Sequence, residues 1–329
     1  MAVSIRGRES AARLYENAEH PVARAYNQAG EKYGVYADGD PGKLDAFHEQ
    51  YAYCDQCVWA LIDEKMRALR SSGARSIRIL DLGCGPGTWL RRIATRAWTL
   101  GFTSITARGI DIADAQVRQA RTLSRKLREL GGVDLTFEVS DICARLPDAD
   151  ASVDLCLCLY GVLNHIPMHR LPAVLSEVAR VTCGHFIMTA RAIGSTPTIC
   201  VDALEEARWF WRDISADRLE IELQNGRRFS LNYQLFRAEE LRAVAAAYFK
   251  LHDLKGLDLF HGRFSGDRRW NPPGSAAGAQ FLHELARLEE LYCRDPDFID
   301  HATHLLLLAS PRKQREHTLE ELPSSGFAE

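Results

Sequence analysis

The hydrophobic pattern is clearest near residue 80, where an apolar run ends at three alternating glycines. Within 77–82, four of six positions are apolar, and they fall on both faces of an extended chain. Such a run is typical of a strand in a parallel sheet that helices cover on both faces. Gly83, Gly85 and Gly87 follow, and a helical rhythm begins at Trp89. The stretch therefore predicts strand, tight turn and helix, the first unit of a doubly wound α/β sheet.

Strand and helix patterns continue to alternate up to about residue 190. The predicted strands are 105–111, 133–139, 152–160 and 184–190, and the predicted helices are 89–100, 115–130 and 170–181. Strands joined by helices in this way form a parallel sheet with right-handed crossovers. We therefore expect the carboxyl ends of these strands to meet at one edge, where ligands bind in such sheets.

The segment before the first strand has a helical pattern of its own. Helices are predicted at 11–20 and 44–69, on either side of a loop rich in glycine and aspartate. That loop carries Tyr33 and Tyr36, which either reach a ligand or serve packing only. We treat 1–73 as an N-terminal helical segment.

An aromatic segment interrupts the chain after the fifth strand. It holds the run Trp209-Phe210-Trp211, and 219–223 with 228–235 predict a hairpin that turns at Asn225-Gly226. An insertion at this place covers the mouth of the pocket, or else adds core or a dimer contact. The resulting division is 1–73, a core at 74–192, the insertion at 193–236, completion of the core at 237–310, and a disordered tail at 311–329.

The composition argues against several classes of function. The 329 residues carry 41 basic and 44 acidic side chains, a net charge of −3, so extensive binding to nucleic-acid phosphates is not expected. No apolar run is long enough to cross a bilayer, and the N-terminus lacks the apolar centre of a secretory signal. We expect a cytoplasmic protein with no membrane or nucleic-acid partner.

The nine cysteines suit a reducing compartment better than a disulfide framework. Cys54 and Cys57 form a C-x-x-C pair, but no second pair of cysteines or histidines stands nearby at zinc-finger spacing. The simpler interpretation is two small residues on one face of a helix, and we predict no metal site.

The glycine spacing indicates which ligand the turn holds. A dinucleotide turn has the pattern G-x-G-x-x-G, whereas here the third glycine comes one residue early and Thr88 takes its place. Asp81 precedes the glycines, and a carboxylate there repels a pyrophosphate and attracts an ammonium group. The pattern acidic-x-G-x-G-x-G resembles the first motif of class I S-adenosylmethionine-dependent methyltransferases. On this resemblance, Asp81, Gly83, Gly85 and Gly87 bind S-adenosylmethionine.

The next two strands end in acids, as the resemblance requires. Asp111 ends the second strand, where the family has an acid that accepts hydrogen bonds from the ribose hydroxyls, and Ile112 follows it. Asp141 follows the third strand, where an acid accepts from the adenine amino group and an apolar residue, here Ile142, covers the ring. Either aspartate alone is equally an N-terminal cap of a helix. Leu159, near the end of the fourth strand, completes the predicted cofactor set.

The resemblance also supplies the rest of the expected fold. It implies a mostly parallel sheet of seven strands in the order 3-2-1-4-5-7-6, with the sixth and seventh strands matched to 249–259 and 304–310 as an antiparallel pair. It further implies that the N-terminal helical segment forms a lid over the cofactor.

The tip of the fourth strand carries the candidate catalytic residues, Tyr160 and His165. In small-molecule methyltransferases this tip lies beside the methyl acceptor. His165 titrates near neutrality and is the candidate base, although a histidine at this place in the family often caps the following helix instead. The N-P-P-Y motif of enzymes that methylate exocyclic base nitrogens is missing here, and Trp270–Pro273 resembles it only superficially, in a predicted loop.

We therefore predict methyl transfer to an O, N or C atom of a small organic acceptor, for example a secondary metabolite, by a protein that is either a monomer or a homodimer. Two alternatives stay open. One is an NAD(P)-dependent oxidoreductase on a similar sheet, against which the early third glycine and Asp81 argue. The other is a protein that binds S-adenosylmethionine without catalysis. This alternative stays open because all the cofactor contacts can be present in a protein that has no catalytic activity.

Overall fold

One seven-stranded sheet forms the centre of the molecule. The computed structural model describes residues 20–29, 52–195, 207–264 and 276–312. The strands of the sheet are β1 (Ser76–Leu82), β2 (Ser104–Asp111), β3 (Val133–Val139), β4 (Val153–Cys158), β5 (Thr182–Arg191), β9 (Phe249–Leu257) and β10 (His304–Pro311). Their order is β3-β2-β1-β4-β5-β10-β9, and β10 runs antiparallel to both of its neighbours. Counted within this sheet alone, the order is 3-2-1-4-5-7-6, and the predicted fold class is confirmed.

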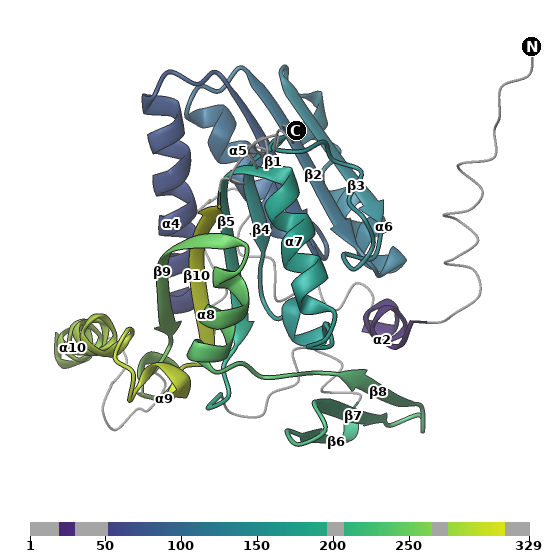
Figure 1. Ribbon diagram of the computed structural model, residues 1–329, viewed down its shortest axis with the longest axis vertical. Coiled ribbons are helices and arrows are strands. Elements are labelled where there is room, and N and C mark those ends of the chain that lie inside the picture. Colours follow the sequence, from purple (N-terminus) through teal and green to yellow (C-terminus); the bar gives the residue numbers. More distant parts are fainter. Residues whose placement is uncertain (1–19, 30–51, 196–206, 265–275, 313–329) are drawn as a thin grey trace, which may run out of the picture.

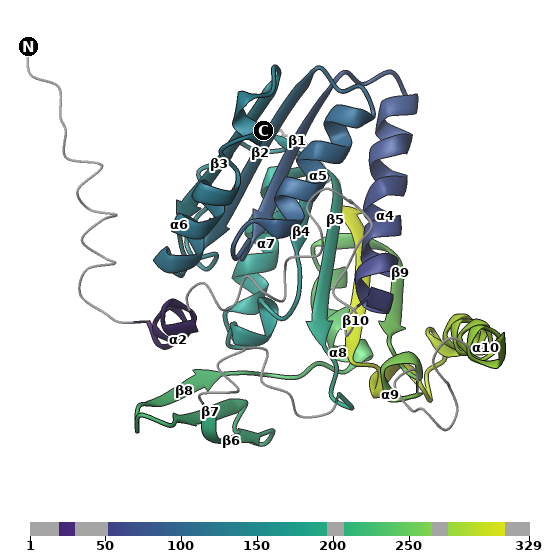
Figure 2. The ribbon, with the colours of Figure 1, turned by 180° about the vertical axis from the view of Figure 1, so that it is seen from behind.

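Helices cover both faces of the sheet. α4 (Ala52–Ser71), α5 (Thr88–Thr99) and α6 (Asp114–Leu123) lie on one face, which Figure 2 presents to the viewer. α7 (Leu171–Val181) and α8 (Ala238–Ala246) lie on the other, in front of the strands in Figure 1. Each face has its own apolar core, so the central strands are buried on both sides.

Strand β1 shows why the sequence forms this layer. Ile77 and Ile79 pack into the core beneath α4 and α5, whereas Leu80 and Leu82 pack into the core beneath α7. Each of the four side chains is no more than 2% exposed. Full burial of one such side chain contributes about 1.5–3 kcal/mol to stability. Burial therefore stabilises the strand and determines which of its side chains point to each face of the sheet.

The predicted helix at 115–130 is shorter than expected, which corrects that prediction. α6 ends at Leu123, the chain turns at Ser124, and only a short 3-10 turn, η2 (Leu127–Glu129), follows. Ser124 is fully buried at this bend. The apolar periodicity alone does not reveal that break.

A second, small sheet lies below the carboxyl ends of the parallel strands, close to α2 (Pro21–Ala29), in both ribbon views (Figures 1 and 2). It is formed by β6 (Ala207–Asp213), β7 (Arg218–Leu223) and β8 (Arg228–Asn232) in that order. Leu219 and Ile221 on its apolar face share a core with Val22 of α2. The predicted hairpin is therefore present as β7 and β8, while β6, which carries Trp209 and Trp211, adds a strand that the hydrophobic pattern did not specify.

The remaining described elements complete the chain. They are η3 (Leu163–His165), α9 (His261–Phe264), α10 (Ala276–Tyr292) and η5 (Ile299–His301). The predicted helix at 11–20 lies outside the described residues except at its last position, as do the loop with Tyr33 and Tyr36, the loop at Trp270–Pro273 and the tail beyond 312. Among the described helices, none combines the length and the apolar character needed to span a membrane.

We expect Gly184→Ala to destabilise the fold. Gly184 lies in β5 opposite a register shift of β4, and a Cβ there would approach within 2.1 Å of the backbone oxygen of Asp154. Because backbone must move to make room, the free energy of unfolding should fall by about 1–3 kcal/mol in urea titrations. Gly131→Ala is the matched control, since a Cβ at Gly131 meets no atom within 4 Å. Equal midpoints for the two variants would contradict this account of β5.

Candidate functional site

The glycine turn after β1 is fixed by backbone bonds to the end of β2. The N–H groups of Gly83 and Cys84 donate to the carbonyl oxygen of Ile110 at 2.8 and 2.9 Å. Gly83 has a φ of 72°, and a Cβ there would lie 2.3 Å from a methyl carbon of Val162. Gly87 has a φ of 76°, and a Cβ there would meet the ring of Phe137 at 2.7 Å. Only glycine fits these positions, so no side chain covers the backbone of the turn at this edge of the sheet.

Asp111, at the end of β2, ties the same turn to the next crossover. Its Oδ2 accepts the Gly85 N–H at 2.9 Å, and its Oδ1 accepts the Ala113 N–H at 2.8 Å. Burial raises the pKa of this carboxyl, and the backbone N–H groups of Ala113, Gly85 and Ile112 oppose the rise. A carboxylate has about four lone-pair sites, so these bonds leave capacity for a ligand. Asp114, the first residue of α6, follows one residue after Ala113.

Asp81 is a buried acid behind the turn. It is 3% exposed, and its side chain makes no hydrogen bond to any part of the chain that the structure describes. Burial raises its pKa to about 7, and the charge of nearby Asp111 adds to the rise. An acid held in this state gains free energy when a cation approaches it.

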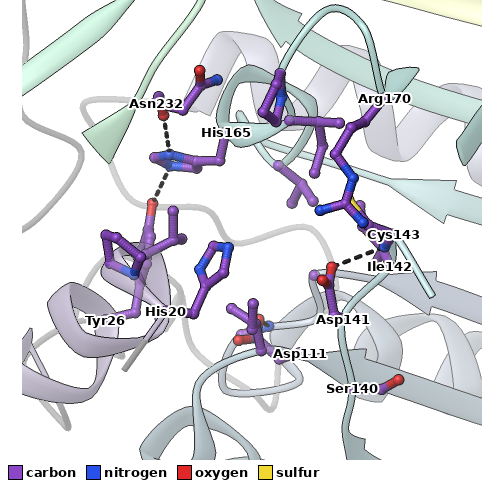
Figure 3. A pocket seen from close by; sticks show the side chains of 18 of the residues that line it. His20, Tyr26, Asp111, Ser140, Asp141, Ile142, Cys143, His165, Arg170 and Asn232 are labelled. Carbon is purple, nitrogen blue, oxygen red and sulfur yellow. Dashed lines mark hydrogen bonds between the residues drawn. The ribbon is translucent and has the colours of Figure 1, made fainter. Parts of the chain in front are cut away.

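A cavity of about 220 Å³ opens above the turn (Figure 3). Nine of the residues predicted from the sequence line it: Gly83, Gly85, Asp111, Ile112, Asp141, Ile142, Leu159, Tyr160 and His165. Asp81 and Gly87 do not line it: Asp81 is buried, and the Gly87 N–H donates to the Cys84 carbonyl oxygen at 2.9 Å within the turn. The acids at the ends of β2 and β3 thus face one cavity, on the same side as the glycine turn.

Asp141 and Ile142 form the wall at the end of β3. The Asp141 Oδ1 accepts the Cys143 N–H at 2.8 Å, which closes a tight turn and directs the carboxyl group toward the cavity (Figure 3). Ile142 is 7% exposed and packs into the core beneath α7. The wall therefore offers one carboxylate and one apolar side chain side by side.

Tyr160, just past β4, has a constrained backbone. Its φ is 55°, in the left-handed region that a bulky residue rarely occupies, and its N–H donates to Thr189 Oγ1 at 2.7 Å. Its hydroxyl donates to the carboxylate of Asp55 on α4, and its ring stacks on Trp89 with centroids 5.8 Å apart. Burial, followed by the charge of Asp55, raises the Tyr160 pKa, so this phenol stays protonated.

His165 joins two covering segments. Its Nδ1 lies 2.9 Å from the carbonyl oxygen of Asn232 at the end of β8, and its Nε2 lies 3.0 Å from the hydroxyl of Tyr26 on α2 (Figure 3). Burial lowers the His165 pKa to about 4, so the ring is neutral at physiological pH. The expectation that this imidazole titrates near neutrality is therefore wrong for the folded chain.

Sequence reasoning missed several polar residues of the cavity wall, among them Tyr26, Arg170, Arg218 and Asn232. Arg170 stands directly before α7, and its guanidinium points into the cavity in Figure 3. Arg218 and Asn232 come from the small sheet. The hairpin pattern locates these strands but not the side of the sheet that meets the cavity, and no local signal marks Tyr26. Across the described residues, no set of three His, Cys, Asp or Glu side chains is placed to hold a metal ion.

Asp81 should make the stability of the ligand-free protein depend on pH. Its folded pKa of about 7 lies above the value of about 3.9 for an unfolded carboxyl. Between these values the folded state holds a proton that the unfolded state has released, so stability falls as pH rises through this window. Asp81→Asn cannot titrate. The unfolding free energy of the variant relative to wild type should therefore rise from pH 5 to 7 by up to about 1.4 kcal/mol per unit, then level off. Urea titrations at each pH measure this, and parallel curves would show that Asp81 is already ionised.

Part of the chain matches a known family. The family model described as a methyltransferase domain matches residues 79–185, which include the glycine turn and both acids. The chain is also similar to the solved structure of the (4+2)-cyclase SpnF, with 18% identity, 89% of this chain and 97% of that chain covered, and a TM-score of 0.49. No curated protein matches the sequence.

Two further solved structures are similar to the chain. The magnesium protoporphyrin IX methyltransferase ChlM of Synechocystis PCC 6803, with bound SAH, has 15% identity over 89% of this chain and 98% of that chain, with a TM-score of 0.47. An S-adenosylmethionine-dependent methyltransferase of Clostridium acetobutylicum ATCC 824 has 11% identity over 75% and 91% of the two chains, with a TM-score of 0.45.

The matched domain contains the strand, glycine turn and acids that the sequence pattern singled out. It spans β1 to the first residues of β5, which in this fold form the cofactor half of the sheet. The match is to a methyltransferase and gives no support to the nicotinamide alternative. Residues 79–185 therefore match a methyltransferase domain, and they lie in a sheet with the strand order β3-β2-β1-β4-β5-β10-β9.

Proposed function

We propose that the protein transfers a methyl group from S-adenosylmethionine to a small organic acceptor that binds in the same cavity. The observation that carries the proposal is the convergence of three separate strand ends on one space. The bare glycine turn, Asp111 and Asp141 all line the cavity above the sheet. Each of these features alone has a purely structural explanation, but together they match the shape and polarity of an adenosyl amino acid.

The residues present fit this cofactor. Gly83 and Gly85 both line the cavity and carry no side chain, so a ligand can lie against the main chain there. Asp81 does not line the cavity, so its buried carboxyl, whose pKa is raised, can act on the ammonium group only through its charge. We assign the ribose hydroxyls to Asp111, the adenine amino group to Asp141, and the faces of the ring to Ile112 and Ile142.

The cofactor supplies a methyl group that its positive sulfur already activates. The chain's own residues orient the acceptor, exclude water and compensate charge. Desolvation is evident in the titratable groups, since burial raises the pKa of Asp81 and of Asp111 and lowers that of His165. Tyr160 and His165 remain our candidates for residues that act on the acceptor. Tyr160 does so as a fixed, protonated side chain and His165 as a neutral ring.

A small acceptor suits the surroundings of the cavity better than a macromolecule. The chain carries no excess of positive charge that would hold a nucleic acid. The cavity is also covered by α2 and by the strands of the small sheet, which contribute Tyr26, Arg218 and Asn232 to its wall. An enclosed site of this kind admits a compact organic molecule and restricts the approach of a folded partner.

Asp111→Ala should weaken binding of S-adenosylhomocysteine by about 1–3 kcal/mol, the usual scale for lost hydrogen bonds to a charged group. The loss has two sources, because the carboxylate holds the Gly85 N–H as well as the ribose. Asp114→Ala is the matched control, since Asp114 pairs with Arg118 on the surface of α6. Isothermal calorimetry measures both variants. An unchanged dissociation constant for Asp111→Ala would remove Asp111 from the site.

The function itself is tested by turnover. Purified protein with methyl-labelled S-adenosylmethionine and a small-molecule extract should transfer label to a low-molecular-weight product, whereas Asp111→Ala should transfer far less at the same cofactor concentration. Calorimetry of the wild type should show binding of S-adenosylhomocysteine and none of NAD. Selective binding of NAD would overturn the proposal. Tight binding of S-adenosylhomocysteine without any labelled product would show that the protein binds the cofactor but does not catalyse methyl transfer.

A further inference from the structure

We propose that Tyr26 is the residue that faces the methyl acceptor and takes up its proton, and that the accepting atom is a hydroxyl oxygen. This inference rests on the methyltransferase function proposed above and names the class of its acceptor. Tyr26 belongs to α2, far outside the matched domain, and its side chain lines the cavity beside His165 (Figure 3).

The hydrogen bonds of His165 fix the direction in which a proton can move. The Asn232 carbonyl oxygen can only accept, so the His165 Nδ1, 2.9 Å away, carries the ring hydrogen. In a neutral ring the Nε2 then presents a lone pair, and the Tyr26 hydroxyl, 3.0 Å away, donates to it. A phenol oxygen that donates in one direction can accept from another. Tyr26 thus connects the cavity to a base that has no hydrogen on the nitrogen facing it.

Buried bonds hold this arrangement in place. Asn164, fully buried just before His165, donates through Nδ2 to the Gln234 carbonyl oxygen at 2.6 Å and accepts the Arg191 N–H through Oδ1 at 2.9 Å. These bonds fasten the β4–α7 loop to β5 and to the chain that leaves β8. The ring of Tyr26 meets that of His165 edge to face, with centroids 5.6 Å apart. His165 is a positioning residue toward the acceptor, because it acts through the Tyr26 hydroxyl.

The other charged groups of the cavity do not take over the role of Tyr26 and His165 in accepting a proton. Those lining the cavity are His20, Arg170, Arg218, Asp111 and Asp141. Of these, His20 is the one whose charge acts on His165, and it lowers the His165 pKa further. Tyr233, whose ring centroid lies 5.2 Å from that of His165, is a neutral neighbour. The imidazole therefore stays unprotonated at neutral pH, as a proton acceptor must.

The weakness of this base selects the acceptor. As a hydroxyl oxygen bonds to the methyl carbon, the carbon–sulfur bond breaks and its electron pair stays on sulfur. The oxygen then carries a proton it holds very weakly, and this proton passes to Tyr26 Oη while the Tyr26 hydrogen passes to His165 Nε2. A group with a pKa of about 4 can accept such a proton. It cannot first deprotonate a carbon acid, and an amine can release its proton to water before it reacts.

Tyr26→Phe tests the assignment. The variant should bind S-adenosylhomocysteine within about twofold of wild type, yet its turnover of hydroxyl acceptors should fall about a hundredfold or more. Wild-type kcat should be flat from about pH 6 to 9. In Tyr26→Phe it should rise about tenfold per pH unit, because only acceptor that is already ionised reacts. Tyr248→Phe, which removes a phenol packed against the core beneath α8, is the control and should match wild type.

Nitrogen NMR of His165 gives a readout that needs no turnover. Loss of the Tyr26 bond should shift the Nε2 resonance in the ligand-free protein, while Nδ1 keeps its hydrogen. His165→Gln offers a second variant should Tyr26→Phe be unstable, and it should show the same rise of kcat with pH.

A flat pH profile with full turnover in Tyr26→Phe would overturn the inference, as would labelled products that are N-methyl or C-methyl compounds. Failure of the wild type to bind S-adenosylhomocysteine, or to label any product, would instead overturn the underlying function.

Discussion

The site depends on the pairing of β1 with β2. In this parallel ladder Leu82 stands opposite Ile110, and the two amides that follow β1 both donate to the Ile110 carbonyl oxygen. The next residue of β2, Asp111, then reaches the Gly85 N–H with its side chain. The shape of the glycine turn and the position of the acid are thus set by one register. A slip of a single residue would turn Asp111 toward the opposite face of the sheet. The apolar residues that fix the register, buried on both faces of β1, therefore hold the cofactor site without touching it.

Burial of this edge explains the electrostatics of the site. It raises the pKa of Asp81 and of Asp111 and lowers the pKa of His165, so burial shifts each group toward its neutral form. The charge of Asp111 adds to the cost of ionising Asp81. A ligand that brings positive charge relieves both penalties at once. A ligand that brings a pyrophosphate adds to them, which is the physical reason why an acid at position 81 discriminates against dinucleotides.

The fold and the cofactor half of the site could be predicted because their signals are local. A continuous apolar run such as 77–82 identifies a buried parallel strand, and alternating glycines identify the turn after it. Acids at strand ends can be assigned to one cavity because parallel strands end at one edge. The acceptor half lacked such signals. Tyr26 lies 139 residues from His165 in sequence, and Asn232 lies 67 residues from it. Their meeting depends on how α2 and β8 pack, which no periodicity encodes.

The covering segments form a structural unit separate from the sheet. α2 precedes β1 and the small sheet follows β5, yet Val22, Leu219, Ile221 and Leu231 pack into one apolar core of their own. Its contact with the cofactor half includes Ile112, which packs against this core from the end of β2. On the proposed function, residues of the cover that line the cavity can therefore change while the β1–β2 register keeps the glycine turn in place. His165 is the exception, because it belongs to the β4–α7 loop and bonds to both halves of the cover. Changes in the cover must preserve those two bonds, so the position of the cover relative to the sheet is constrained even where the rest of the cavity wall is not.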